Sequence, residues 1–233
     1  SSAPAVAASA WSADPWRMYR RALAAVESWS LEGEDLNPEI LSAYREAASW
    51  VLALGRDHLA IADVGAGVGR DLLYIRQSFG QLGLPLQVVA VEPNELAWPA
   101  LQERLLWCSG VVVKDAAELS AGSFDLAVLQ QVLCSADAPQ QLLAELRGAL
   151  KPGGGLLFVE HMCSSLGFRL LRPLQWTLCG CDLCRDPAAL LRSFAWQELA
   201  ITCFDAPVLG VPLVPHIRGL AIKAEVSSGH DFL

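Results

Sequence analysis

Short apolar runs alternate with amphipathic segments through the middle of this 233-residue chain. The runs lack the regular alternation of apolar and polar positions that a half-exposed strand shows, so we expect strands that are covered by helices on both faces. The segments between the runs have apolar residues at helical spacing. Strands are predicted at 59–64, 86–91, 111–113, 124–130 and 156–160, and helices at 69–79, 94–107 and 137–149. This order predicts an α/β fold, in which right-handed crossovers connect the strands of a parallel sheet.

Different patterns precede and follow this alternation. Residues 1–13 are rich in Ala and Ser, and start signals for two helices follow at Asp14-Pro15 and Asn37-Pro38, the second helix ending at Gly55. Further along, helical stretches are predicted at 165–179 and 186–194, and strands at 198–206 and 216–225. Because no helix separates these last two strands, we expect them to pair antiparallel. The predicted segments are a tail with covering helices over 1–57, one domain over 58–226 and a C-terminal tail over 227–233.

Composition and charge narrow the function classes. Hydrophobic residues make up 53% of the chain and charged residues 18%, which suffices for one domain with a large core. The net charge is −8 with acids and bases interspersed, so we expect no nucleic-acid substrate, since there is no basic stripe to bind phosphates. The seven cysteines are odd in number and unevenly spread, and no secretory leader pattern or apolar run of membrane-spanning length occurs. We therefore expect a reducing, cytoplasmic setting.

A glycine-rich loop follows the first predicted strand. The sequence Asp63-Val64-Gly65-Ala66-Gly67-Val68-Gly69 lies directly after the apolar run 59–62 and before a predicted helix. Gly65 and Gly67 tolerate positive φ and carry no Cβ, so a ligand can lie against the main-chain N–H groups at the helix start. In the dinucleotide fingerprint G-x-G-x-x-G the third glycine would fall at position 70, where this chain has Arg70, and this favours a cofactor other than NAD.

An acid follows the second predicted strand. The run 86–91 ends at Glu92-Pro93-Asn94, at about the distance from the glycine loop that one strand–loop–helix–strand unit spans. The carboxyl ends of neighbouring parallel strands meet at one edge of the sheet, so we expect Glu92 beside the loop. There its carboxylate can hold two ribose hydroxyls, which predicts a ribose-containing cofactor.

Together, the glycine loop and the Glu92 motif resemble the first two motifs of the class I S-adenosylmethionine-dependent methyltransferases. Phe124–Val128 and Leu150–Gly155 match the fourth-strand motif of that family and the turn that re-aims the chain into strand five. The resemblance implies a Rossmann-like, seven-stranded, mostly parallel sheet with helices on both faces and an antiparallel last strand. It also implies N-terminal helices that cover the active site, although packing on the sheet edge alone is an equal alternative.

The same resemblance implies S-adenosyl-L-methionine as the cofactor and a set of cofactor-binding residues. These are Asp63, Gly65, Ala66, Gly67, Gly69, Glu92, Pro93, Asp115, Ala116 and Gln130. Asp115 follows the third predicted strand, where the family has an acid that accepts a hydrogen bond from the adenine amino group. An ordinary solvated loop aspartate is the alternative.

A second group of motifs narrows the resemblance. It consists of Val132-Leu133-Cys134-Ser135, Glu160-His161, Trp176, Gly180-Cys181-x-x-x-Arg185 and Pro215-His216-Ile217-x-Gly219-x-Ala221-Ile222-Lys223. Over residues 59–224 the chain is similar to the thiol S-methyltransferase branch of the methyltransferase-like enzymes, which implies a small apolar thiol as methyl acceptor. The alternatives are the same chemistry on a lipid, quinone or amine, and a non-catalytic cofactor-binding protein. Membrane-associated members of this branch carry a hydrophobic N-terminal segment that this chain lacks, so peripheral membrane contact stays open.

His161 is the candidate catalytic residue. It follows the fifth predicted strand, at the edge of the sheet where α/β proteins bind ligands, and an imidazole there can raise the thiolate fraction of a thiol whose pKa is about 8.5. A structural histidine bonded to backbone is the alternative. The acceptor-side candidates are Cys134, as a small core residue near the cofactor, Trp176, as core or pocket wall, and His216. His216 reaches this edge only if its strand begins there, and a surface position is the simpler expectation.

A cysteine cluster raises the question of a metal. Cys181 and Cys184 have C-x-x-C spacing, with Cys179 beside them and Cys163 upstream. A zinc site of this type needs a second pair with matching spacing, and none follows in the sequence. We therefore predict no metal and no redox pair.

Overall fold

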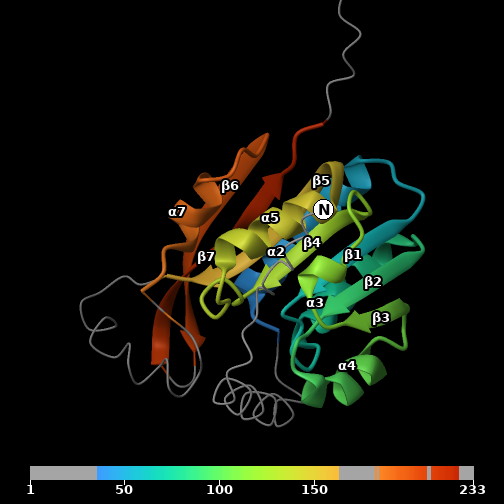
Figure 1. Cartoon of the computed structure of the whole chain (residues 1–233), viewed down its shortest axis with the longest axis horizontal. Coiled ribbons are helices and arrows are strands. Elements are labelled where there is room, and N and C mark those ends of the chain that lie inside the picture. Colours follow the sequence, from blue (N-terminus) through green and yellow to red (C-terminus); the bar gives the residue numbers. More distant parts are fainter. Residues whose placement is uncertain (1–35, 163–181, 183, 209–210, 226–233) are drawn as a thin grey trace, which may run out of the picture.

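The computed structural model describes residues 36–162, 182, 184–208 and 211–225 (Figure 1). Within these residues, seven strands form one sheet in the order β3-β2-β1-β4-β5-β7-β6. The strands are β1 Leu59–Val64, β2 Leu86–Val91, β3 Ser109–Val113, β4 Phe124–Gln130, β5 Leu150–His161, β6 Glu198–Val208 and β7 Val211–Ile222. The helices are α2 Pro38–Ala53, α3 Arg70–Phe79, α4 Trp98–Arg104, α5 Pro139–Ala149 and α7 Pro187–Arg192. Short 3₁₀ turns lie at Gly80–Leu82, Glu95–Ala97 and Ala116–Glu118.

The sheet has the predicted topology. β1 pairs in parallel with β2 on one side and with β4 on the other, and the β2–β3 and β4–β5 pairs are also parallel. β7 pairs antiparallel with both β5 and β6. The chain moves from β1 outward to β3 and returns on the other side of β1 to form β4, so the strand order reverses between β1 and β4. In open α/β sheets, ligands bind at the carboxyl ends of the strands beside such a reversal.

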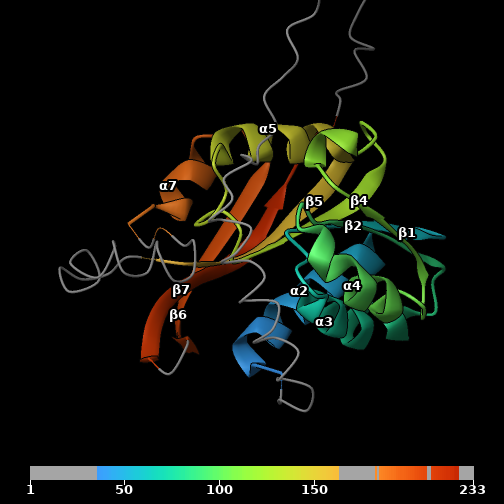
Figure 2. The same ribbon diagram turned by 60° about the horizontal axis from the view of Figure 1, so that its bottom comes forward.

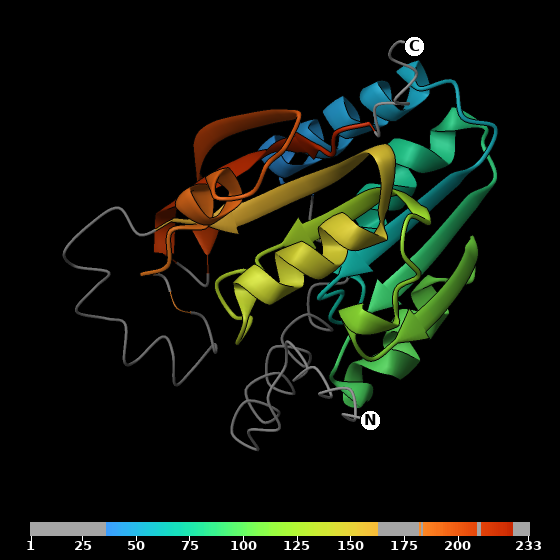
Figure 3. The same ribbon diagram turned by 45° about the horizontal axis from the view of Figure 1, so that its top comes forward.

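Helices cover both faces of the sheet. α5 and α7 lie on one face, whereas α2, α3 and α4 lie on the other (Figure 2). In Figure 3, α5 passes in front of the sheet and α2 lies behind it. Successive β1 residues alternate between the two apolar clusters on these faces, with Ala60 and Ala62 in one cluster and Leu59 and Ile61 in the other. This double burial explains why the strand runs are continuously apolar.

α2 begins where the sequence predicts. Asn37 is its N-cap, and Asn37 Oδ1 accepts hydrogen bonds from the backbone N–H groups of Glu39 (2.9 Å) and Ile40 (3.3 Å). Farther along the helix, Glu46 Oε1 accepts a hydrogen bond from Arg218 Nη1 of β7 (2.8 Å). α2 is therefore joined to the antiparallel side of the sheet by a charged pair.

The predicted helix 94–107 is divided in two. A 3₁₀ turn, Glu95–Ala97, precedes α4, and Pro99 lies at the start of α4. Proline has no N–H to donate, so a single continuous helix would lose a hydrogen bond at this position.

β5 is longer than predicted. It begins at Leu150 rather than at 156, because its pairing with β4 continues through an irregularity instead of ending at the Pro-Gly-Gly turn. A Cβ at Gly154 would lie 2.9 Å from the Lys151 carbonyl oxygen, so this irregularity requires glycine.

Several predicted features lie outside the described residues. These are the helix from Pro15, the stretch 165–179, Cys163, Trp176, Cys179 and Cys181. Among the described helices, none has the length and apolar character needed to cross a membrane.

Candidate active site

The glycine loop joins β1 to α3 at the carboxyl edge of the sheet. Its three glycines all have positive φ, with values of 72° at Gly65, 55° at Gly67 and 89° at Gly69. A Cβ at Gly65 would lie 2.6 Å from Val132 Cγ2, so packing as well as backbone conformation favours glycine there, and a Cβ at Gly69 would lie 3.0 Å from Leu72 Cδ1, a tight contact. At Gly67 the nearest described atom would be 4.0 Å away. Within the described structure, the space beside the Gly67 Cα is therefore open.

Glu92 lies directly after β2, beside this loop. Its Oε2 accepts a hydrogen bond from the Gly67 N–H (2.8 Å), and its Oε1 accepts one from the Asn94 N–H (2.7 Å). The Trp98 indole N–H donates to the Glu92 carbonyl oxygen (2.8 Å). Glu92 is buried, so these bonds stabilise an ionised carboxylate that has little contact with water. A carboxylate oxygen can accept more than one hydrogen bond, so these two bonds do not by themselves exclude contacts to ligand hydroxyls.

Asp63, near the end of β1, is fully buried. Within the described residues, neither of its carboxylate oxygens has a hydrogen-bond partner. Burial, and then the negative charge of Glu92, raise the pKa of Asp63 to about 7. An acid in this position is stabilised either by a proton or by a nearby positive charge.

His161 and His216 lie opposite each other where β5 and β7 meet at the carboxyl edge. Both are buried, and their ring centroids are 5.2 Å apart. The expectation that His216 lies on the surface was wrong. Because β7 runs antiparallel, its earlier residues lie beside the end of β5, and this pairing brings the two imidazoles together.

His216 has a defined tautomer. His216 Nδ1 lies 2.6 Å from the Val214 carbonyl oxygen, which only accepts, so Nδ1 carries the proton. His216 Nε2 then accepts a hydrogen bond from the Gln131 side-chain amide (3.4 Å). Burial, and then the positive charge that His161 carries when it is protonated, lower the pKa of His216 to about 4, so the His216 imidazole is neutral near pH 7. Phe204 of β6 stacks on the same ring, with centroids 5.1 Å apart.

Gln131 and Phe204 carry no signal in the sequence. Gln131 follows β4 with φ 58°, a left-handed conformation that is uncommon for a residue other than glycine. Phe204 lies opposite His216 through the register of β6 and β7. Both positions depend on strand pairing and backbone conformation, which local hydrophobic patterns do not reveal.

Residues 62–158, which span the glycine loop, Glu92 and most of β5, match the family model of the methyltransferase domain. Human thiol S-methyltransferase TMT1B is 28% identical over 205 residues, which cover 80% of this chain and 81% of the human protein. Human thiol S-methyltransferase TMT1A is 28% identical over 181 residues, which cover 71% of each chain. The structure of a SAM-dependent methyltransferase from Methanosarcina mazei covers 83% of this chain and 100% of its own, with 19% identity and a TM-score of 0.57. This chain contains a methyltransferase domain and is an S-adenosylmethionine-dependent methyltransferase.

The cofactor of this methyltransferase, S-adenosyl-L-methionine, carries a positive sulfonium, an ammonium group and a ribose. Its chemistry fits the residues at the carboxyl edge in three respects. The space beside the Gly67 Cα is open, Glu92 is a buried acid bonded to the loop, and Asp63 is a buried acid without a described hydrogen-bond partner. These groups lie beside the reversal in strand order, where such a ligand is expected.

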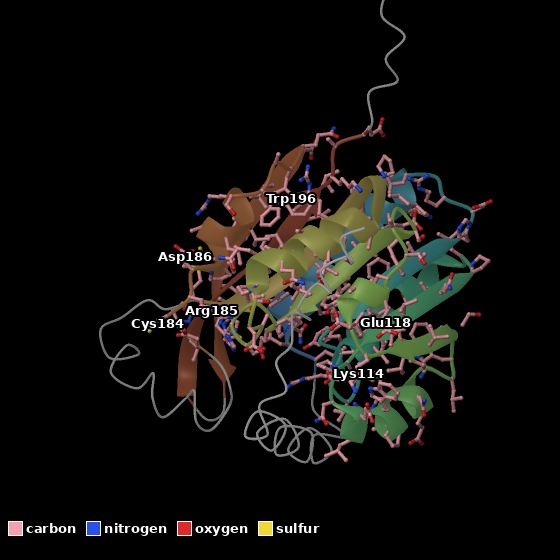
Figure 4. The ribbon with its side chains drawn as sticks, viewed as in Figure 1. Lys114, Glu118, Cys184, Arg185, Asp186 and Trp196 are labelled. Carbon is pink, nitrogen blue, oxygen red and sulfur yellow. The ribbon has the colours of Figure 1, made fainter. Side chains whose placement is uncertain are left out.

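Asp115 and Ala116 begin a turn after β3. Asp115 Oδ1 accepts a hydrogen bond from the Ala117 N–H (3.0 Å), and Glu118 Oε1 accepts hydrogen bonds from the N–H groups of Asp115 (2.8 Å) and Lys114 (2.9 Å). This reciprocal capping fixes the turn, with Lys114 and Glu118 near the end of β3 (Figure 4). Asp115 is half-buried, and its role toward adenine stays a prediction.

Gln130 ends β4 at the same edge. Its Oε1 accepts a hydrogen bond from the Tyr44 hydroxyl of α2 (3.3 Å), and the Tyr44 ring stacks on that of Tyr74, with centroids 5.1 Å apart. Burial, followed by the charges of Asp71 and Asp63, raises the pKa of Tyr44 well above its ordinary value. α2 therefore reaches the carboxyl edge through a buried tyrosine, in addition to packing on the sheet.

Three other predicted residues lie around the loops at this edge. Ala66 is buried, and its N–H donates to the Val91 carbonyl oxygen (3.1 Å). Pro93 is half-buried after Glu92. Cys134 is a buried core residue as predicted, and its thiol donates to the Gln131 carbonyl oxygen (3.4 Å).

Of the cysteine cluster, Cys184 lies within the described residues and is half-buried. In that part of the chain, no group of three or more potential metal ligands occurs. Cys179 and Cys181 lie outside it, so the prediction about a metal at the cluster stays untested.

Proposed function

We propose that this methyltransferase methylates the sulfur atom of a small apolar thiol. Its similarity to human thiol S-methyltransferase TMT1B over 80% of the chain supports this acceptor. The observation that carries the proposal is the buried pair of His161 and His216, at the same edge of the sheet as the glycine loop. An imidazole is a base whose ordinary pKa suits the deprotonation of a thiol near neutral pH.

In this proposal Glu92 holds the ribose hydroxyls of the cofactor, and the main chain of Gly65-Ala66-Gly67 lies against it. Asp63 supplies negative charge toward its cationic groups. The remaining cofactor contacts come from Gly69, Pro93, Asp115, Ala116 and Gln130.

The bound cofactor supplies an electrophilic methyl group. The thiol sulfur forms a bond to this carbon while the bond from the carbon to the sulfonium sulfur breaks, which gives a thioether and S-adenosylhomocysteine. His161 takes the thiol proton, because a free thiol with a pKa of about 8.5 is mostly protonated at neutral pH. The chain contributes chiefly by aligning the two reacting atoms, which is worth several kcal/mol in such a displacement.

His216 supports this proton transfer. Because it is neutral near pH 7, it places no positive charge beside His161. The Val214 carbonyl and the Gln131 amide fix its orientation. The other acceptor-side residues of the proposal are Cys134 and Trp176, the latter as an apolar wall.

A matched acceptor panel tests the substrate class. Hexanethiol, hexanol and hexylamine share one apolar chain and differ in the nucleophile, and phenol extends the comparison to aromatic hydroxyls. We expect the thiol to react fastest, because an alcohol needs a far stronger base. The measurement is the formation of S-adenosylhomocysteine at neutral pH. Reaction of the amine or phenol without reaction of the thiol would contradict the thiol assignment and favour a quinone, lipid or amine acceptor.

The variant His161→Ala tests the proton transfer. We expect kcat/KM for the thiol to fall about a hundredfold at neutral pH, because the removal of a general base has effects of this order. The deficit should shrink as the pH rises past about 8.5, where solvent deprotonates the thiol without help. His58→Ala removes an exposed histidine before β1 and serves as the control. A deficit that does not change with pH would mean that His161 only shapes the pocket.

A further inference from the structure

A single helical turn, residues 132–136, follows β4 and contacts the glycine loop. The N–H groups of Ser135 and Ala136 both donate to the Val132 carbonyl oxygen (2.9 Å each). Val132 fills the space beside Gly65, since a Cβ on that glycine would lie 2.6 Å from Val132 Cγ2. The position of this turn therefore sets one wall of the glycine loop.

A turn this short is not stable alone, because its end groups have no partners within the turn itself. At the N–H end, Glu160 Oε1 accepts hydrogen bonds from the N–H groups of Val132 (2.8 Å) and Leu133 (2.9 Å). At the carbonyl end, Arg185 Nη1 donates to the carbonyl oxygens of Leu133 (2.8 Å) and Ala136. The carboxylate and the guanidinium thus lie at the ends of the turn that attract their charges.

Neighbouring residues hold Arg185 in this position. The Asp182 N–H donates to the Cys134 carbonyl oxygen (2.9 Å), so the segment binds the turn at a second point. The Asp182 side chain accepts a hydrogen bond from the Cys184 N–H (3.0 Å), and Asp186 is the N-cap of α7. Cys184, Arg185 and Asp186 form the connection that leads into α7 (Figure 4). Since α7 packs on the sheet, it provides a rigid base for the guanidinium.

We propose that Arg185 is a positioning residue for cofactor binding: it holds the carbonyl end of the turn 132–136 and thereby keeps Val132 packed against Gly65. One guanidinium nitrogen binds two carbonyl oxygens, a geometry that the planar group of arginine holds better than the flexible ammonium of lysine does. This role is independent of the methyl acceptor and so goes beyond the thiol assignment.

Calorimetric titration with S-adenosylhomocysteine tests this role without a methyl acceptor. We expect Arg185→Ala to weaken binding about tenfold and Arg185→Lys to weaken it less, because small displacements of a binding site have large effects. In assays with an acceptor that the parent methylates, KM for S-adenosylmethionine should rise more than kcat falls. Arg192→Ala removes the same charge from the exposed end of α7 and should bind as the parent protein does.

A double-mutant cycle separates positioning from a general loss of stability. Val132→Ala shortens the side chain beside Gly65 and should weaken binding by a similar factor. The affinity of the double variant should then fall by less than the product of the two single-variant factors, because both changes act through one contact. Independent effects would overturn the proposal, as would an Arg185→Ala protein with a lower melting temperature and unchanged affinity. If Arg185→Ala does not fold, Arg185→Lys takes its place in the cycle.

Discussion

Asp125, at the amino end of β4, and Asp63, at the carboxyl end of β1, are both fully buried acids, but their surroundings differ. Asp125 Oδ2 accepts hydrogen bonds from Lys151 Nζ (2.8 Å) and the Ala60 N–H (3.0 Å), and Arg56 Nε lies 3.4 Å from Asp125 Oδ1. Asp63 has no hydrogen-bond partner within the described residues. The chain itself neutralises the acid at one end of the sheet, whereas no hydrogen-bond donor of the described residues contacts the acid at the other end.

This difference concerns the stability of the fold at Asp125 and the proposed binding of the cofactor at Asp63. An ionised carboxylate in a protein interior costs free energy unless cations and hydrogen bonds compensate it. The compensation of Asp125 is built into the folded chain and joins the second residues of three neighbouring strands, β1, β4 and β5. Asp63 instead has a pKa raised to about 7, which fits its proposed role toward a cationic cofactor and comes at the expense of stability.

Of the three replacements at these buried acids, that of Asp125 should change a free energy the most. Asp125→Ala leaves Lys151 and Arg56 without their buried counter-ion, so the free energy of unfolding should fall by about 3–4 kcal/mol. This value is at the lower end for the loss of a buried ion pair, because both cations are partly exposed. Urea denaturation measures the loss. Asp125→Asn keeps the shape and one acceptor and should lose less. Weaker S-adenosylhomocysteine binding by folded Asp125→Asn would show that the two ends of the sheet are coupled.

Replacing Glu92 removes the buried acid that the cofactor itself is expected to contact. Glu92→Ala removes two charge-assisted hydrogen bonds to ribose, so we expect S-adenosylmethionine to bind about 3 kcal/mol more weakly, roughly a hundredfold in Kd. Titration calorimetry measures this change. Glu95→Ala removes a nearby exposed acid and serves as the control. Unchanged affinity in Glu92→Ala would refute the ribose assignment.

The pKa of Asp63 predicts a smaller, pH-dependent effect. A cationic ligand favours the ionised form of Asp63, so binding should release a proton, and affinity should rise roughly tenfold between about pH 6 and 8 and then level off. Without ligand the sign for stability is reversed: the raised pKa favours the folded state at low pH, and this contribution is lost as the pH rises through about 7. Calorimetry in two buffers of different ionisation enthalpy measures the proton release. Asp63→Asn should abolish it, and a parent protein that releases no proton would contradict the electrostatic role.

The sequence predicted best the elements whose residues are buried on every side. The bounds of β1, β2 and β4 agree with the predicted strands, because strands between two helical layers leave unbroken apolar runs. The start of β5 could not be predicted in this way. Its first residues join the sheet through an irregular pairing with β4, and the Pro-Gly-Gly sequence there resembles an ordinary turn.

In the site, too, the sequence did not predict features that depend on strand pairing. Glu92 was placed beside the glycine loop because residue types at fixed spacing identify that motif, and the Gly67–Glu92 hydrogen bond confirms that they are neighbours. The burial of His216 could not be predicted, since it depends on the register between β5 and β7. Arg185 belonged to a recognised motif, but its partners are backbone carbonyls, which every residue carries and no sequence pattern marks.

At Gln131, the stability of the backbone and the contact to His216 favour different residues. Its left-handed backbone costs about 1 kcal/mol or more, which glycine would not incur. Glycine would also remove the amide that faces His216 Nε2. Selection for heat resistance alone would therefore favour glycine at position 131, whereas the proposed role of His216 in proton transfer would favour the strained glutamine.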